Sequence, residues 1–226
     1  MSQKLGFIFL APLTSFLILG CGNKKEENIF KSQNCINTAT AASVNGCLNF
    51  VEGQTSARSY VLRCSAAFIS QGIDESAIVD AIRNIEGKDS GNPTTPAIAA
   101  LAMESTEISN QALEDCTKSE SKSLAALANF ANLSTAMTAV LGVVGDNPTQ
   151  AEIEALIASY DPNNPPSPAD KEALGAAVIA SQDSLCNTKN GLFKGTKACT
   201  DINSAIQANP NNASAVADAL IGNINS

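Results

Sequence analysis

The sequence predicts an all-α protein, a disulfide-braced helical bundle or array of helical hairpins with roughly six to eight helices. Apolar residues recur at helical spacing nearly throughout the chain, and sustained period-2 alternation is absent. Residues that start and stop helices separate the periodic segments. Only 4% of the residues are aromatic, so the core must be built from Ala, Leu, Ile and Val.

The first clearly periodic helix is predicted from Ile73 to Glu86. Asp74 is a suitable N-cap, and Gly87 ends the segment. One face carries three isoleucines at helical spacing, Ile78, Ile82 and Ile85. We therefore expect this helix to pack along that face.

Thr95 and Pro96 form the next helix start, because threonine can cap a helix and proline is favoured at its first position. Apolar residues continue beyond them at helical spacing, at Ile98, Leu101, Ile108 and Ala112. The pattern predicts helical structure over this stretch.

The segment between Lys122 and Asp146 holds 23 uncharged residues, which is long enough to span a bilayer. It contains amides and hydroxyls that would be costly in hydrocarbon, among them Asn129, Asn132, Ser134, Thr135 and Thr138. We therefore interpret it as a central, largely buried helix of a bundle. A spanning or pore-forming helix stays as the alternative.

A further helix is predicted from Asn147 and Pro148 onward. Its apolar residues align on one face, at Ile153, Leu156, Ile157 and Tyr160. The proline-rich run from Asp161 to Pro168 ends this helix and leaves Ser167 to cap the next one.

The N-terminus has the features of an export signal. Lys4 precedes an apolar run from Phe7 to Gly20 that is shorter than the about 20 apolar residues of a spanning helix. Its end, Leu17-Ile18-Leu19-Gly20-Cys21, resembles the lipobox of bacterial lipoproteins, where a branched aliphatic residue, a tolerant position and a small residue precede an invariant cysteine. Leu19 is bulkier than the commonest choice at its position.

This resemblance implies export, cleavage before Cys21 and attachment to a membrane by acyl chains, palmitate among them, on that cysteine. In lipoproteins sorted by the residue after the cysteine, Asp retains the protein at the inner membrane, so Gly22 favours the outer membrane of the bacterial envelope. Two other interpretations stay open, namely an ordinary cleaved signal peptide and an uncleaved anchor in which Cys21 occurs by chance.

The lipoprotein interpretation divides the chain into three parts. Residues 1–20 are the signal peptide, and residues 21–34 are a polar, flexible tether. Residues 35–226 form a single all-α domain, with a candidate sub-boundary near residue 146.

Six cysteines follow Cys21, an even number that predicts three disulfides in an oxidising compartment: Cys35, Cys47, Cys64, Cys116, Cys186 and Cys199. A metal cluster is the alternative, but no cysteine pair has C-x-x-C spacing and the chain has no histidine. Sequence alone does not choose among the connectivities.

A faint repeat suggests one pairing of these cysteines. Three similar strings occur, SAIVDAI, STAMTAV and SAVADAL, each downstream of a cysteine, as a repeated cysteine-bearing helical hairpin would produce. Chance convergence of Ala-rich helices explains the strings equally well. On the repeat hypothesis the preferred pairing is Cys47 with Cys64, Cys186 with Cys199, and Cys35 with Cys116.

The charge of the chain excludes several partners. Residues 21–226 carry 13 Lys and Arg against 22 Asp and Glu, a formal net charge of −9. Such a surface repels phosphate backbones and anionic lipid, which disfavours nucleic-acid binding and leaves membrane attachment to the acyl chains. Without Trp, a platform for stacking bases or sugars is also disfavoured.

The sequence offers few groups for catalysis. Without histidine there is no Ser-His-Asp triad and no Cys-His dyad. Two carboxylate pairs are candidates for glycosidase-type chemistry, but such neighbours point in different directions on a helix. These pairs are Glu152 with Glu154 and Glu114 with Asp115. We therefore expect no catalytic, metal or cofactor site.

Two classes of function remain. The favoured one is a membrane-anchored exported lipoprotein, a non-catalytic structural or protein-interaction module of the bacterial envelope with an unidentified protein partner. The alternative is a helical binding protein for a small apolar or lipid ligand. A solid core with an exposed apolar patch would favour the first class, and a closed apolar cavity the second. Catalysis by carboxylates or a Ser-Lys pair is a third hypothesis.

Overall fold

The computed structural model describes residues 23–86, 94–142, 151–152, 155, 166–187, 191 and 194–224. In these residues all regular structure is helical and three disulfides brace it, which confirms the predicted fold class. The described helices are α1 (Lys24–Ile36), α2 (Val44–Cys47), η1 (Leu48–Val51, a 3-10 helix), α3 (Ala57–Ser70), α4 (Glu75–Glu86), α5 (Thr94–Leu101), α6 (Thr106–Lys118), α7 (Lys122–Val140), α9 (Pro168–Cys186), α10 (Lys197–Ala208) and α11 (Ala213–Ile224).

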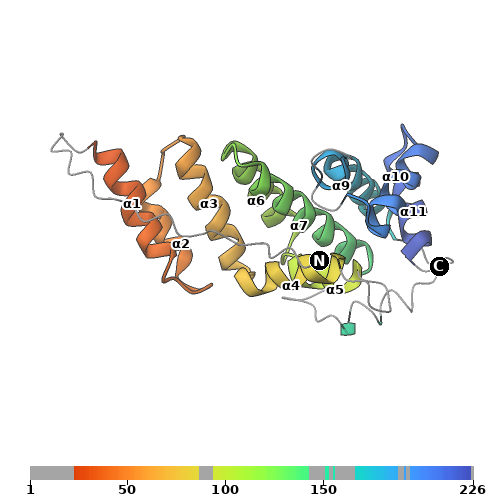
Figure 1. Cartoon of the computed structure of the whole chain (residues 1–226), viewed down its shortest axis with the longest axis horizontal. Helices are drawn as coiled ribbons and strands as arrows, with labels where there is room; N and C mark the ends of the chain where they lie inside the picture. The colour runs from red at the N-terminus through yellow and green to blue at the C-terminus, as the bar shows by residue number, and fades with distance from the viewer. Residues whose placement is uncertain are drawn as a thin grey trace, which may run out of the picture.

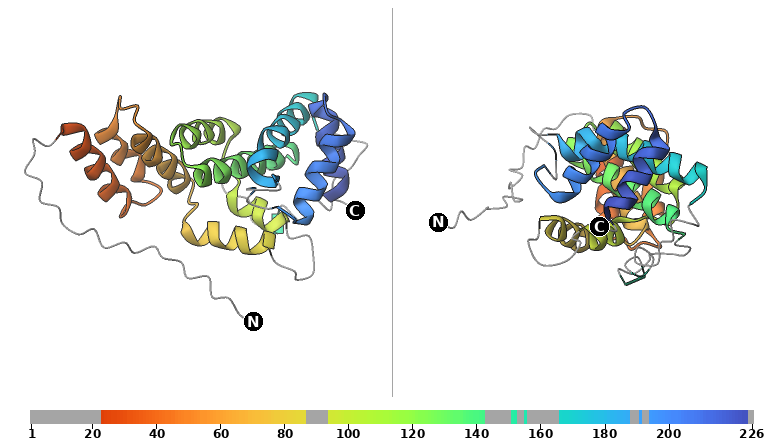
Figure 2. Two further views of the ribbon diagram at one scale, coloured as in Figure 1. Left: turned by 45° about the horizontal axis from the view of Figure 1, so that its top comes forward. Right: turned by 90° about the vertical axis from the view of Figure 1, so that its right-hand side faces the viewer.

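The helices form an elongated array (Figures 1 and 2). α1 and α2 lie at one end, α10 and α11 lie at the other, and α3, α6, α7 and α9 form the row between them (Figure 1). α4 and α5 pack against each other on one side of this row. Helices α1 and α11 therefore lie far apart, at opposite ends of the molecule.

Helix α1 corrects the expected flexible tether of residues 21–34, because the chain is helical from Lys24 onward. The Asn23 side chain caps the helix. Ile29 and Ile36, two turns apart on one face, are buried against the neighbouring elements. The burial of this narrow apolar stripe outweighs the polar composition on which the tether prediction depends.

Two hydrophobic cores share helix α3. The small core lies between α1, α2, η1 and one face of α3, to which Leu62 and Ala66 belong. The large core includes Cys64 and Phe68 on the other face of α3 and extends to α11. Residues two apart on a helix point in nearly opposite directions, so α3 is a wall common to both cores.

Helix α4 begins as predicted. The carboxylate of Asp74 accepts hydrogen bonds from the Ser76 hydroxyl at 2.6 Å and from the Ala77 amide at 2.9 Å. These two bonds lower the pKa of Asp74. Gly87 and the side chains of Ile82 and Ile85 lie outside what the structure describes.

The stretch predicted as helical from Thr95 onward is two helices, α5 and α6, and α5 already begins at Thr94. Residues 102–105 separate them. Side chains from other elements bind the backbone amides of this break: Thr135 Oγ1 accepts from Met103, and Gln71 Oε1 accepts from Glu104, both at 2.9 Å.

Helix α7 is the central helix that the sequence predicts, and it packs against α5, α6 and α9. Most of its apolar residues are buried, and so are four of its polar ones: Asn132, Ser134, Thr135 and Thr138. Asn132, for example, donates hydrogen bonds to Ser109 Oγ at 3.1 Å and to Asn110 Oδ1 at 2.8 Å. None of the described helices combines the length and apolar character needed to cross a bilayer.

The C-terminal helices extend the large core from α7 into α9, α10 and α11. α9 begins at the predicted cap, where Ser167 Oγ accepts from the Asp170 amide at 3.2 Å. α11 approaches α9 so closely at Gly175 that an added Cβ would overlap the Ala213 carbonyl. The region around the candidate sub-boundary near residue 146, and the predicted apolar face of Ile153, Leu156, Ile157 and Tyr160, lie outside the described residues.

Candidate functional site

The six cysteines that follow Cys21 in the sequence form three disulfides. Each bridge joins two helices: Cys35–Cys47 joins α1 to α2, Cys64–Cys116 joins α3 to α6, and Cys186–Cys199 joins α9 to α10. All of these cysteines except Cys35 are buried in the two cores. The bridges are therefore structural parts of the cores rather than exposed redox groups.

The structure corrects the preferred pairing. Cys186 pairs with Cys199 as predicted, but Cys47 pairs with Cys35 instead of Cys64. The repeat hypothesis requires a disulfide from Cys47 to Cys64 of α3, and Cys47 does not form it. Cys64 instead reaches Cys116 of α6, because α3 and α6 pack side by side.

The carboxylate candidates separate in space. Glu114 is exposed and forms an ion pair with Lys118, whereas its neighbour Asp115 is buried against the core. Glu152 is exposed, and Glu154 lies outside the described residues, as does Cys21. Glu114 and Asp115 therefore do not converge on one point as a glycosidase pair would.

Asp115 is the one buried carboxylate among the described residues whose surroundings shift its titration. Burial raises its pKa above the ordinary value of 3.8. A hydrogen bond of 3.4 Å from Gln111 Nε2, and the nearby positive charge of Arg63, partly oppose this rise. Arg63 itself lies over the ring of Tyr60, with its Cζ 5.0 Å from the ring centroid.

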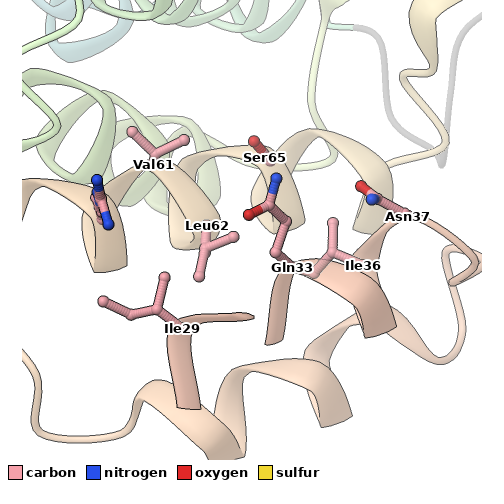
Figure 3. A pocket seen from close by; sticks show the side chains of 8 residues that line it. Ile29, Gln33, Ile36, Asn37, Val61, Leu62 and Ser65 are labelled. Carbon is pink, nitrogen blue, oxygen red and sulfur yellow. The ribbon is translucent and has the colours of Figure 1, made fainter. Parts of the chain in front are cut away.

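A groove of about 270 Å³ lies between α1 and α3 (Figure 3). Its floor is apolar and its rim is polar: Ile29, Ile36 and Leu62 are buried, Val61 and Ser65 are half-buried, and Gln33, Asn37 and Arg58 are exposed. The groove is thus open to solvent along its polar side. It is the apolar concavity that the ligand-binding hypothesis requires, although it is not closed.

A second groove, of about 430 Å³, lies where the start of α7 meets the end of α9. Most of its lining residues are polar, with Lys122 from α7 and Asp183 from α9 among them, but more of its lining surface is apolar than polar. Its charged side chains suit a small apolar ligand less well than the groove between α1 and α3, where Arg58 is the one charged lining residue.

Few large apolar side chains are exposed in the described residues. Phe30 is 63% exposed on α1 and Phe50 is 40% exposed on η1, and these two elements pack against each other. Val79 and Ile179 are also exposed, but they belong to two other helices, α4 and α9. The sequence did not single out either phenylalanine, because Phe30 falls in the expected tether of residues 21–34 and no helix is predicted around Phe50.

Within the described residues, no group of three or more His, Cys, Asp or Glu side chains has the arrangement of a metal site. Comparison of the chain with protein-family models, with curated proteins and with solved structures finds no significant match. The function is therefore inferred from the chemistry of this chain alone.

Proposed function

We propose that this chain is an exported lipoprotein, anchored through acyl chains on Cys21, whose helical array is a non-catalytic protein-interaction module of the bacterial envelope. One observation carries the proposal. Six of the seven cysteines pair with one another, so none of them is left to pair with Cys21. An odd cysteine in an exported chain calls for a separate role, and the lipobox-like sequence before Cys21 supplies one.

The disulfides support export, because such bonds form and persist in oxidising compartments and are rare where thiols are kept reduced. The form of the domain supports a role in protein contacts. A row of stacked helices presents long continuous faces to a partner, in contrast to a compact domain with one deep pocket. The outer membrane is the destination that Gly22 favours.

The test is expression of the full chain in a bacterium, followed by detergent extraction and mass spectrometry of the unreduced protein. We expect an N-terminus at Cys21 that carries acyl chains, together with three intact disulfides. Cys21→Ala is the matched control and should abolish both acylation and partition into the detergent phase. An unmodified chain that begins at Met1, or one with six free thiols in the described domain, would overturn the proposal.

A second candidate function is binding of a small apolar ligand in the groove between α1 and α3 (Figure 3). Its buried floor of Ile29, Ile36 and Leu62 supports this candidate. Its volume of about 270 Å³ is below the range of about 300–1,000 Å³ of ordinary ligand sites, which ranks it second.

Native mass spectrometry of the purified domain tests the ligand hypothesis. A bound fatty acid at one per chain, lost when Val61→Trp fills the groove, would support it. A chain that carries no ligand and gains none from added fatty acids would exclude it.

A further inference from the structure

The two exposed aromatic side chains of the described residues lie at one end of the array. Phe30 belongs to α1 and Phe50 to η1, and these elements pack against each other at the end opposite α10 and α11 (Figures 1 and 2). The small core is complete without these two side chains, because other residues of α1, η1 and α3 form it. The aromatic rings are therefore available for an external apolar contact.

Charge is distributed unevenly along the chain. Residues 23–72, which form α1 to α3, carry five Lys and Arg against three Asp and Glu, a net charge of +2. Residues 73–226 carry eight Lys and Arg against 19 Asp and Glu, a net charge of −11. The repulsion of anionic lipid that the net charge of the whole chain predicts therefore applies to the second part, whereas a surface rich in anionic lipid would attract the first.

The covalent chain limits how far the aromatic end can lie from the proposed lipid. Cys21 is three residues before Lys24, the first residue of α1, and three extended residues span at most about 10 Å. Phe30 follows six residues later, about 9 Å along the helix. On the proposed function, acyl chains on Cys21 would therefore hold α1 next to the lipid headgroups.

We propose that α1 and η1 form a membrane-contacting surface, in which Phe30 and Phe50 enter the headgroup region of a bilayer that contains anionic lipid. The inference rests on the proposed lipid anchor. It adds to that attachment an orientation of the helical array relative to the bilayer. Aromatic side chains are favoured at this depth of a membrane, and the positive end of the molecule faces the anionic headgroups. The part of the molecule from α4 to α11, which is acidic as a whole, then projects away from the membrane.

The chain contains no Trp, so one introduced Trp reports on one position without background. The variants F30W and F50W place it at the proposed contact. I179W is the matched control, because Ile179 is 39% exposed, close to the 40% of Phe50, but lies on α9 in the acidic part. Circular dichroism checks that each variant keeps the helical fold.

Each acylated variant is inserted into vesicles of phosphatidylethanolamine and phosphatidylglycerol, with and without brominated acyl chains. We expect F30W and F50W to show blue-shifted emission on the vesicles and loss of fluorescence on brominated lipid. I179W should show neither change. Raising the fraction of phosphatidylglycerol should strengthen the quenching of F30W and leave I179W unchanged.

Three outcomes would overturn the inference in distinguishable ways. If the chains float with the vesicles but all three variants are unquenched or quenched equally, the anchor stands and the orientation fails. If the blue shift of F30W depends on protein concentration and not on lipid, a second copy of the chain covers this surface. If the chains do not float and Cys21 is unmodified, the proposed function fails and the inference fails with it.

Discussion

The backbone amide of Met103 donates a hydrogen bond of 2.9 Å to the hydroxyl of Thr135, and both residues are buried. This bond fixes the break between α5 and α6 against the central helix α7. Thr135→Val keeps the shape of the side chain but leaves the amide unpaired in the core. We expect the free energy of unfolding to fall by about 1–3 kcal/mol, measured by urea denaturation followed by circular dichroism.

The adjacent hydroxyl provides the control for that prediction. Ser134 Oγ is buried and has no hydrogen-bond partner among the described residues. Ser134→Ala therefore removes a polar group without breaking a bond and should be neutral or slightly stabilising. Equal losses from the two substitutions would show that the hydrogen bond to Met103 does not support the break.

The disulfides should differ in what they contribute to stability. Cys64–Cys116 spans 52 positions and Cys35–Cys47 spans 12. Loop-closure entropy of the unfolded chain predicts contributions of about 4 and about 3 kcal/mol respectively. Paired Cys→Ala variants of each bridge, compared by urea denaturation, should show the larger loss for Cys64–Cys116. A larger loss at Cys35–Cys47 would contradict the entropic explanation.

Asp115 should make the fold less stable as the pH rises. Burial raises the pKa of its carboxyl in the folded chain, so the folded chain binds more protons than the unfolded chain above pH 3.8. Stability therefore decreases as the pH rises from the unfolded pKa through the folded one. We expect Asp115→Asn to be more stable than the native chain at pH 7, and this advantage to shrink as the pH is lowered through that window.

Denaturation midpoints at a series of pH values measure the effect at Asp115. Asp183→Asn, which changes an exposed carboxylate of α9, is the control and should give no comparable gain. A native chain and an Asp115→Asn variant with the same stability at pH 7 would show that burial of this carboxylate carries no cost.

Two glycines in neighbouring helices should respond in opposite directions to alanine. At Gly175 of α9 the new methyl group would overlap the backbone of Ala213, so Gly175→Ala should destabilise the fold by about 1–3 kcal/mol. At Gly222 of α11 nothing lies within 4 Å of an added Cβ, so Gly222→Ala should stabilise by about 0.5–1 kcal/mol. Thermal unfolding followed by circular dichroism gives both values. A tolerated Gly175→Ala would show that α9 and α11 can separate without loss.

Local features of this fold could be predicted from the sequence, because they depend on residues within one helical turn. Asp74 and Ser167 cap their helices as predicted, since each side chain bonds to an amide three residues ahead. The break after α5 could not be predicted in this way. The acceptor for its Met103 amide comes from Thr135, which is 32 positions away.

The disulfide pairing shows how a weak pattern can mislead. The repeat hypothesis favoured Cys47 with Cys64, although Cys35 and Cys47 are separated by 12 positions, nearly the 13 of Cys186 and Cys199. Loop length does not select the observed pair either, because closing 12 positions instead of the 17 between Cys47 and Cys64 saves only about 0.3 kcal/mol of chain entropy. The pairing follows from which helices pack together, as α3 and α6 do across the 52 positions between Cys64 and Cys116.

The candidate surfaces depend on packing between distant segments. Ile29 and Leu62 line one groove only because α1 packs against α3. The polar composition of Lys24–Ile36 does not predict this packing. The exposure of Phe30 likewise follows from which face of α1 is covered. A sequence pattern gives the faces of a helix, but the partner that covers each face comes from the tertiary fold.

The disulfides also determine how the molecule would respond to mechanical tension between its two ends. Tension between the two ends of the chain passes through each disulfide bond instead of through the loop that the bond closes. The loops 36–46, 65–115 and 187–198 therefore carry no load while the bonds persist. Reduction of Cys64–Cys116 alone would lengthen the fully extended chain by about 170 Å, the extended length of the loop 65–115. A reducing agent would release these loops, so the extended length of the same chain depends on the redox state of its surroundings.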